Sequence, residues 1–155
     1  MITSTTADRS PARLALLVAS EHVETNPLYV PANGLTHCNA FVAAVCARMA
    51  AAIPLILANA QHEYLEGPAG QAAGWEKVDA HTAQSLADQG ALAVASWANP
   101  VINPDGSHGH GHIAILMPSL GEDGVWVAQA GARNFTRDLI QHGFGPIAPS
   151  YFIHP

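Results

Sequence analysis

The chain has 155 residues, of which 49% are apolar and 12% charged. This is the length of one domain with one hydrophobic core, and the composition excludes an intrinsically disordered chain. The formal net charge is −6, and the six lysines and arginines are spread along the sequence. No basic stripe is present to bind phosphates or anionic lipid, so we expect neither a nucleic acid nor a membrane as a partner. No internal repeat or linker is visible, and we predict a single domain over residues 1–155.

The first predicted element is a helix over residues 11–24. Ser10 and Pro11 provide an N-cap residue and a proline at the first helical position. The apolar run LALLVAS at residues 14–20 is too short for the core of an export signal, and it is far below the ~18 residues that span a bilayer. We therefore expect a chain that is made in the cytoplasm without a signal peptide.

Three more helices and four strands are predicted further along the chain. The helices run from near Cys38 to before Pro54, over residues 54–67 and over residues 79–90, and the strands cover residues 91–97, 112–118, 125–131 and 150–154. The turn PSLGEDG joins the second and third strands into an antiparallel hairpin. Helices first and strands afterwards is the order of an α+β domain, here with the N-terminal helices packed on one face of a small antiparallel sheet.

The two cysteines lie in different surroundings in the second predicted helix. Cys38 lies in the first turn, where unpaired N–H groups and the positive end of the helix dipole favour an anion. Such a position can lower a thiol pKa to about 3.5–7.5, which predicts a usable nucleophile. Cys46 lies on an apolar helix face and is expected to be inert. Eight helical residues separate the two Cα atoms by about 12 Å, too far for a disulfide, so both thiols should be free.

A nucleophilic cysteine needs a base, and the segment SHGHGHIAILMP offers three histidines. His112 stands where the glycine-rich loop becomes a strand, so sheet backbone would hold its ring beside a cleft. His108 and His110 precede it on the loop. Residues two apart in an extended chain point to the same side, and the three histidines are therefore also candidate metal ligands, although no carboxylate or cysteine is adjacent.

Several segments together resemble one family. HCNAFVAAVCARMAAAIP is similar to the nucleophile helix of NlpC-type cell-wall peptidases and of the related cysteine, histidine-dependent amidohydrolase/peptidase (CHAP) domains, whose pattern is approximately Asp-Cys-Ser-Gly-Phe-Val. DQGALAVASW resembles their Gly-Asp-Leu-Val strand, and GHIAILMP resembles their Gly-His-Val-Ala-Ile-Val strand. VWVAQAG resembles the strand that carries the third polar catalytic residue, and NPLY resembles their Thr-Pro-Tyr segment. The blocks occur in the order that the family has.

The resemblance implies a papain-like α+β fold in which Cys38 attacks an amide carbonyl and His112 acts first as base and then as acid. It implies that Gln129, by its position, orients the imidazole. It also implies that Tyr29 and the backbone N–H of Cys38 hold the tetrahedral oxyanion. Neither a cofactor nor a metal is implied.

Departures from the family pattern bear on substrate specificity. His37 replaces the Asp before the nucleophile, Asn39 and Ala40 replace the Ser-Gly after it, and Ala91 replaces the Asp of the Gly-Asp-Leu strand. His37 and Asn39 flank the nucleophile and are therefore candidate substrate contacts.

The family implies hydrolysis of amide bonds in the stem peptides of bacterial peptidoglycan. The chain resembles phage lysis or tail enzymes and antibacterial effectors, which act in the periplasm or cell wall after delivery by another system. A carrier or an immunity protein would then be its partner. Other classes stay open: a non-catalytic or metal-binding module on the same scaffold, and a thiol acyltransferase. Retinol-acyltransferase-like proteins share a similar helix but carry their histidine before the cysteine, whereas His112 follows Cys38.

The register of the predicted hairpin decides which residue orients His112. If the strands pair so that His112 lies opposite residue 128 or 129, Gln129 is its neighbour, and a slip of one residue would turn Gln129 to the other face. A buried amide there needs a partner, and the imidazole N–H is one. Asn134 in the next loop is the alternative orienting residue.

Overall fold

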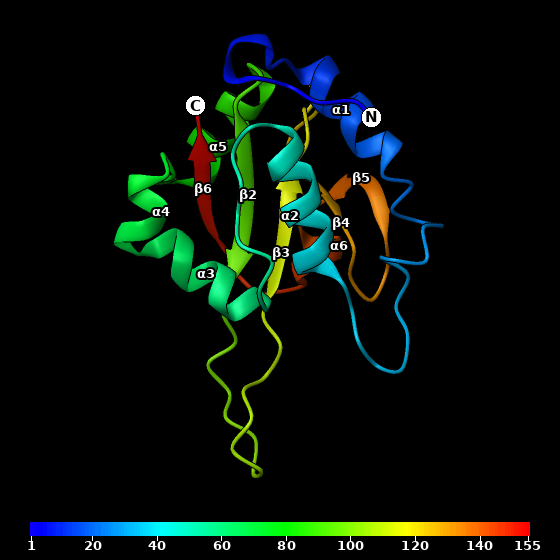
Figure 1. Cartoon of the computed structure of the whole chain (residues 1–155), viewed down its shortest axis with the longest axis vertical. Helices are drawn as coiled ribbons and strands as arrows, with labels where there is room; N and C mark the ends of the chain where they lie inside the picture. The colour runs from blue at the N-terminus through cyan, green and yellow to red at the C-terminus, as the bar shows by residue number, and fades with distance from the viewer.

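The computed structural model describes all of residues 1–155 and is an α+β fold (Figure 1). The helices are η1 (Thr6–Asp8), α1 (Pro11–Ser20), α2 (Cys38–Arg48), α3 (Ala58–Glu66), α4 (Pro68–Ala72), α5 (Ala80–Asp88) and α6 (Gln141–Phe144). The strands are β1 (Glu76–Val78), β2 (Leu92–Trp97), β3 (His112–Leu116), β4 (Trp126–Gln129), β5 (Phe135–Leu139) and β6 (Ser150–His154). They form one antiparallel sheet in the order β1-β6-β2-β3-β4-β5.

Helix starts are confirmed where a polar cap was expected. The Ser10 hydroxyl accepts from the Arg13 N–H at 3.1 Å and begins α1. α1 ends at Ser20, four residues earlier than predicted, because the next residue, Glu21, turns into the core and forms an ion pair with Arg48 of α2. His22 has a left-handed φ of 51°, which also stops the helix.

The predicted helix over residues 54–67 is shorter in the structure. Residues 54–57 form an extended loop before α3, and Pro68 begins α4 instead of a loop. The buried side chain of Gln61 holds this loop, because its Nε2 donates to the Pro54 carbonyl at 3.0 Å. Leu55 and Leu57 consequently stay exposed on the loop.

Helices cover both faces of the sheet, which corrects the expectation of one covered face. α1, α2 and α3 pack with sheet residues such as Ile113 and Ile115 in the larger core cluster. α5 and α6 pack with Ala114 and Leu116, which point to the opposite face. Figure 1 shows α2 and α3 in front of the sheet and α5 behind it.

The sheet is also larger than predicted, because β1 and β5 were not expected. β1 has only three residues, and the sequence of β5, FTRDL, carries three polar residues that are more typical of a loop. The four predicted strands are all present, and none of their ends is shifted by more than two residues. No helix has the length and apolarity that crossing a membrane requires.

The β3–β4 hairpin forms, in a register two residues away from the nearer of the two predicted alignments. Ile115 pairs with Ala128, which aligns His112 with Gly131 and not with residue 128 or 129. A shift of two residues preserves the face to which a side chain points, whereas a shift of one would reverse it. Gln129 therefore still faces the same side of the sheet as His112.

Candidate active site

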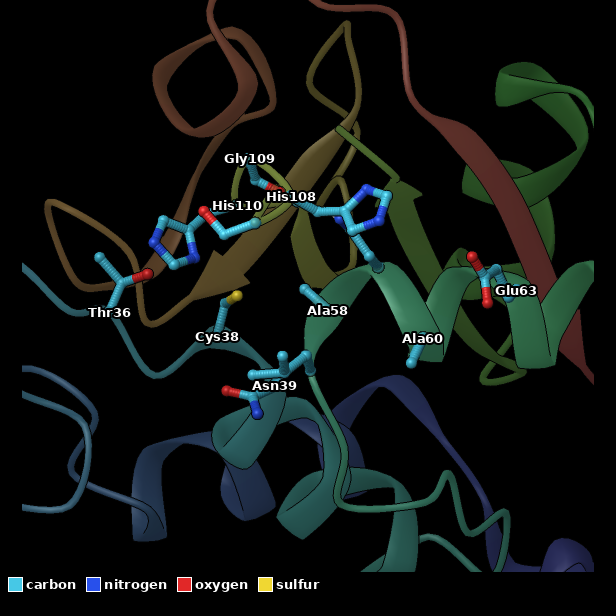
Figure 2. A pocket seen from close by; sticks show the side chains of 13 residues that line it. Thr36, Cys38, Asn39, Ala58, Ala60, Glu63, His108, Gly109 and His110 are labelled. Atoms are coloured by element: carbon cyan, nitrogen blue, oxygen red, sulfur yellow. The ribbon is translucent and has the colours of Figure 1, made fainter. Parts of the chain in front are cut away.

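Cys38 is the first residue of α2, and its thiol faces a cavity of about 420 Å³. The other walls are the start of α3, around Ala58, and the loop of residues 107–111 that leads into β3. Figure 2 shows the sulfur pointing into this space between Ala58 and the loop histidines. A small molecule or a peptide segment can therefore reach a thiol that is only 4% exposed.

Burial raises the pKa of the Cys38 thiol, and this is the strongest influence on it. The N–H groups of Ile113, Asn39 and Cys38 itself, with the Thr36 hydroxyl, act in the opposite direction by favouring the thiolate. The predicted lowering by the helix start is therefore outweighed by loss of water around the sulfur. In the free protein Cys38 is a neutral thiol that needs a base to become a nucleophile.

His112 and Gln129 form a direct hydrogen bond, Nε2 to Oε1, at 2.6 Å. The amide nitrogen of Gln129 donates to the Arg133 carbonyl at 2.9 Å, so the amide oxygen must be the atom that faces the ring. An amide oxygen only accepts, and the proton of a neutral imidazole is therefore on Nε2. This leaves Nδ1 of His112 as an acceptor, which is the state that a general base requires.

The surroundings of His112 keep its ring neutral. Burial lowers its pKa, and the hydrogen bond with Gln129 raises it by a smaller amount. The ring packs against Phe144 of α6 with a centroid separation of 4.7 Å. A base with a lowered pKa is deprotonated at neutral pH and is ready to take a proton from a thiol.

Two glycines leave room for the His112–Gln129 pair. A Cβ at Gly143 would lie 2.2 Å from Gln129 Oε1, and a Cβ at Gly131 would lie 2.9 Å from Gln129 Nε2 and 3.3 Å from His112 Cε1. Neither glycine was identified from the sequence. Gly131 follows Gln129 closely in VWVAQAG and could have been noticed, whereas nothing local marks Gly143.

The thiol and the imidazole reach the start of β3 from opposite faces of the sheet. Cys38 belongs to the core cluster on the α2 side, and it adjoins the N–H of Ile113, the residue after His112. The His112 ring contacts Phe144 on the α6 side. No hydrogen bond joins the two side chains in this structure. Proton transfer between them would therefore require a change in the position of the imidazole.

Tyr29 does not serve as an oxyanion donor here, which corrects the role implied by the family pattern. Its hydroxyl donates to Glu21 Oε2 at 2.7 Å, and its ring packs edge-on against Phe41 with centroids 5.5 Å apart. Burial, together with this hydrogen bond, raises the pKa of Tyr29. The residue is part of the core and does not line the cavity.

The side chain of Asn134, the alternative orienting residue, forms hydrogen bonds with other groups and not with His112. Its Nδ2 donates to the carbonyls of Val23 and Tyr29 at 2.8 and 2.9 Å, and its Oδ1 accepts from Gly131 N–H. It anchors the segment before α2 to the turn after β4. Of the two candidates, the structure places Gln129 and not Asn134 against His112.

The two residues that flank the thiol differ in their placement. Asn39 lines the cavity, and its Nδ2 is fixed by a bond to the Ile56 carbonyl at 2.9 Å. His37 occupies the N-cap position without a capping side-chain bond and does not line the cavity. A substrate in this cavity would therefore meet Asn39 but not His37.

The three loop histidines do not converge on one point. His108 and His110 line the cavity, and Figure 2 shows their rings facing it near Cys38. His112 is turned towards Gln129 instead. No group of three His, Cys, Asp or Glu side chains in the chain is arranged to hold a metal ion.

Asn59 holds the histidine loop in place, a role that sequence reasoning missed. Its Nδ2 donates to the Gly109 carbonyl at 3.0 Å, and its Oδ1 accepts from the Asn99 N–H at 2.9 Å. A Cβ at Gly111 would lie 2.2 Å from the same Oδ1, so the chain needs glycine there. The glycine spacers between the histidines therefore allow close packing on α3.

No protein-family model and no curated protein matches this chain. The function must accordingly be argued from the site itself.

Proposed function

We propose that the chain is a cysteine amidohydrolase of the papain-like, NlpC or CHAP type. Cys38 would be the nucleophile, His112 the base and Gln129 the residue that orients the base. The observation that carries the proposal is the 2.6 Å bond from His112 Nε2 to Gln129 Oε1, because it fixes the imidazole proton on Nε2 and leaves Nδ1 free to accept a proton. A neutral thiol in a cavity and a neutral, oriented imidazole are the two parts that this chemistry needs.

In the proposed reaction, the imidazole of His112 would first move towards the cavity, past the start of β3. Nδ1 of His112 then takes the thiol proton while the sulfur attacks an amide carbonyl in the cavity. The N–H groups in the first turn of α2, including that of Cys38, would stabilise the oxyanion. The imidazolium then gives its proton to the leaving amine, and a thioester remains on Cys38. Water, deprotonated by His112, hydrolyses the thioester and restores the free thiol.

The proposed substrates are stem peptides of bacterial peptidoglycan. This assignment rests on the resemblance of the nucleophile helix and the histidine strand to cell-wall peptidases. The cavity has room for a short peptide segment and is lined by both apolar and polar side chains. The chain would reach the periplasm or cell wall through another delivery system, with a carrier or an immunity protein as its partner.

Mass analysis of peptidoglycan fragments tests this proposal. Purified sacculi are incubated with the protein and with Cys38→Ala, and new amino and carboxyl ends are located in the products. We expect cleavage of a stem-peptide amide by the wild-type protein alone, unaffected by a chelator. Release of no fragment would contradict the substrate assignment, and inhibition by a chelator that zinc reverses would favour a metal-dependent enzyme.

A further inference from the structure

The polar side chains around the Cys38 cavity fall into two groups. Those of Asn39 and Asn59 are bonded to neighbouring backbone and hold the walls in shape. Those of His108, His110 and Glu63 form no hydrogen bond or ion pair within the protein. The second group is therefore free to meet a ligand.

Glu63 is the one formally charged side chain of the cavity wall at neutral pH. No lysine or arginine lies within ion-pair distance of its carboxylate, although the neighbouring Glu66 is paired with Lys77. A carboxylate without a counter-charge beside a cavity makes the local potential negative, and it attracts cationic groups. Glu63 is thus the charge that a ligand in this cavity would meet.

The position of Glu63 sets where on the substrate a positive charge would lie. Ala58, at the start of α3, adjoins the thiol, and Glu63 is farther along the same helix (Figure 2). The five-residue step from Ala58 to Glu63 corresponds to about 7.5 Å along the helix axis. This separation matches a basic group several bonds away from the carbonyl that Cys38 attacks, and not one on the neighbouring atom.

We propose that Glu63 is a specificity-determining residue, which selects amide substrates that carry an ammonium group several bonds from the scissile carbonyl. The proposal rests on the function proposed above, since it assumes that Cys38 attacks a substrate in this cavity. Ala60 lines the cavity and lies three residues before Glu63, on the same side of α3, so an aliphatic chain that bears the ammonium group could lie against it.

Charged thiol reagents test whether Glu63 attracts cations to the cavity, and this test does not require hydrolysis. The probes are three methanethiosulfonates: aminoethyl, which is cationic, sulfonatoethyl, which is anionic, and methyl, which is neutral. Each transfers its thioalkyl group to the Cys38 sulfur and releases methanesulfinate. Mass spectrometry follows the modification of Cys38 in the wild-type protein, Glu63→Gln, Glu63→Lys and the control Glu24→Gln, in which an exposed carboxylate outside the cavity is removed.

We expect the ratio of cationic to anionic labelling rates to fall about tenfold in Glu63→Gln and to reverse in Glu63→Lys. Glu24→Gln should leave the ratio within about twofold of the wild type, and high salt should reduce all differences. An unchanged ratio in both Glu63 variants would overturn the proposal. Since Glu63 is exposed, neither substitution should affect folding.

Rates of hydrolysis test the substrate preference itself. Peptidoglycan fragments are compared before and after acetylation of their free amino groups. We expect acetylation to lower kcat/KM of the wild type about tenfold, mainly through KM, and to change that of Glu63→Gln by less than about twofold. Equal sensitivity of both proteins would overturn the substrate preference. Absence of hydrolysis with every fragment would instead count against the proposed function, and the labelling ratio would then decide the role of Glu63.

Discussion

One cysteine lies near each end of α2. Both side chains are buried, but only that of Cys38 can be reached from a cavity. Cys38 is 4% exposed and Cys46 is 0% exposed, and burial raises the pKa of both thiols. Cys38, however, faces a cavity and lies among N–H groups at the helix start. Cys46 is enclosed in the core, and the positive charge of Arg9 only weakly opposes the effect of its burial.

The other side chains near the two ends of α2 differ in the same way. Near Cys38, His112 reaches the start of β3 from the other face of the sheet, and its ring is oriented by Gln129. Near Cys46, Arg48 pairs with Glu21, which also accepts from Tyr29. If the proposed function holds, substitutions at the Cys38 end should affect activity and substitutions at the Cys46 end should affect stability.

Removal of either reacting group should have the largest effect. Cys38→Ala and His112→Ala are each expected to lower kcat about a thousandfold or more, and the double variant should be no worse, because the two residues act as a unit. Turnover on peptidoglycan fragments measures this. His110→Ala should stay within about tenfold of the wild type; if it is inactive while His112→Ala is active, the base is His110.

Misplacement of the orienting amide should have a smaller effect. Gln129→Ala is expected to lower kcat about tenfold to a hundredfold, because the ring loses its fixed orientation. Gly143→Ala should behave similarly, since its Cβ would occupy the place of the Gln129 oxygen. Gln141→Ala, on the exposed side of the same short helix, is the control. Full activity of Gly143→Ala would mean that the amide position is not required.

The pH dependence of the rate should follow the pKa of His112, which depends on the side chain at position 129. In the proposed mechanism neutral His112 is the base, so activity should fall as the pH decreases through its pKa, which burial places below the ordinary value. The Gln129 bond raises this pKa by favouring the protonated ring, and Gln129→Ala should therefore move the acid limb to lower pH. Gln129→Glu adds a negative charge and should move it to higher pH. Shifts of the same sign in both variants would contradict the assigned contact.

At the other end of α2 we expect losses of stability without losses of turnover. Cys46→Ser buries a hydroxyl in apolar surroundings and should lower the free energy of unfolding by about 1–3 kcal/mol. Cys38→Ser should instead abolish nearly all activity and cause little loss of stability. Denaturant unfolding and initial rates measure the two properties separately. A strong loss of turnover in a folded Cys46→Ser protein would remove the distinction between the two ends.

The smallest effect on turnover is expected for Tyr29→Phe. The lost hydrogen bond to Glu21 should cost about 1 kcal/mol of stability, and kcat should stay within about twofold. A large loss of kcat in this variant would indicate that the Tyr29 hydroxyl does stabilise the oxyanion.

Local signals in the sequence were sufficient for much of the fold. Ser10 and Asp79 predicted two helix starts, since each accepts a hydrogen bond from the first turn. The apolar strands of the hairpin were also predicted. β5 was missed because FTRDL carries three polar residues, and it becomes a strand only by pairing with β4, the strand that precedes it.

For the site, the sequence predicted the contact of His112 with Gln129, but it did not predict that Cys38 reaches the start of β3 from the opposite face of the sheet. His112 and Gln129 were predicted as partners, and they remain so because a register shift of two preserves their faces. The direction of the Cys38 pKa shift was wrong, because it depends on how much water the folded chain removes from the sulfur. Tyr29 was assigned by resemblance, yet Glu21, eight residues earlier, binds its hydroxyl in the core.

Alkylation of the two cysteines tests the difference between the ends of α2 most directly. Native protein is treated with iodoacetamide near neutral pH, and peptide mapping by mass spectrometry gives the rate at each thiol. We expect Cys38 to react at least about a hundredfold faster than Cys46, to slow in His112→Ala, and to react at a rate similar to that of Cys46 once the chain is unfolded. Equal rates at the two thiols in the folded protein would contradict the assignment of Cys38 as the nucleophile.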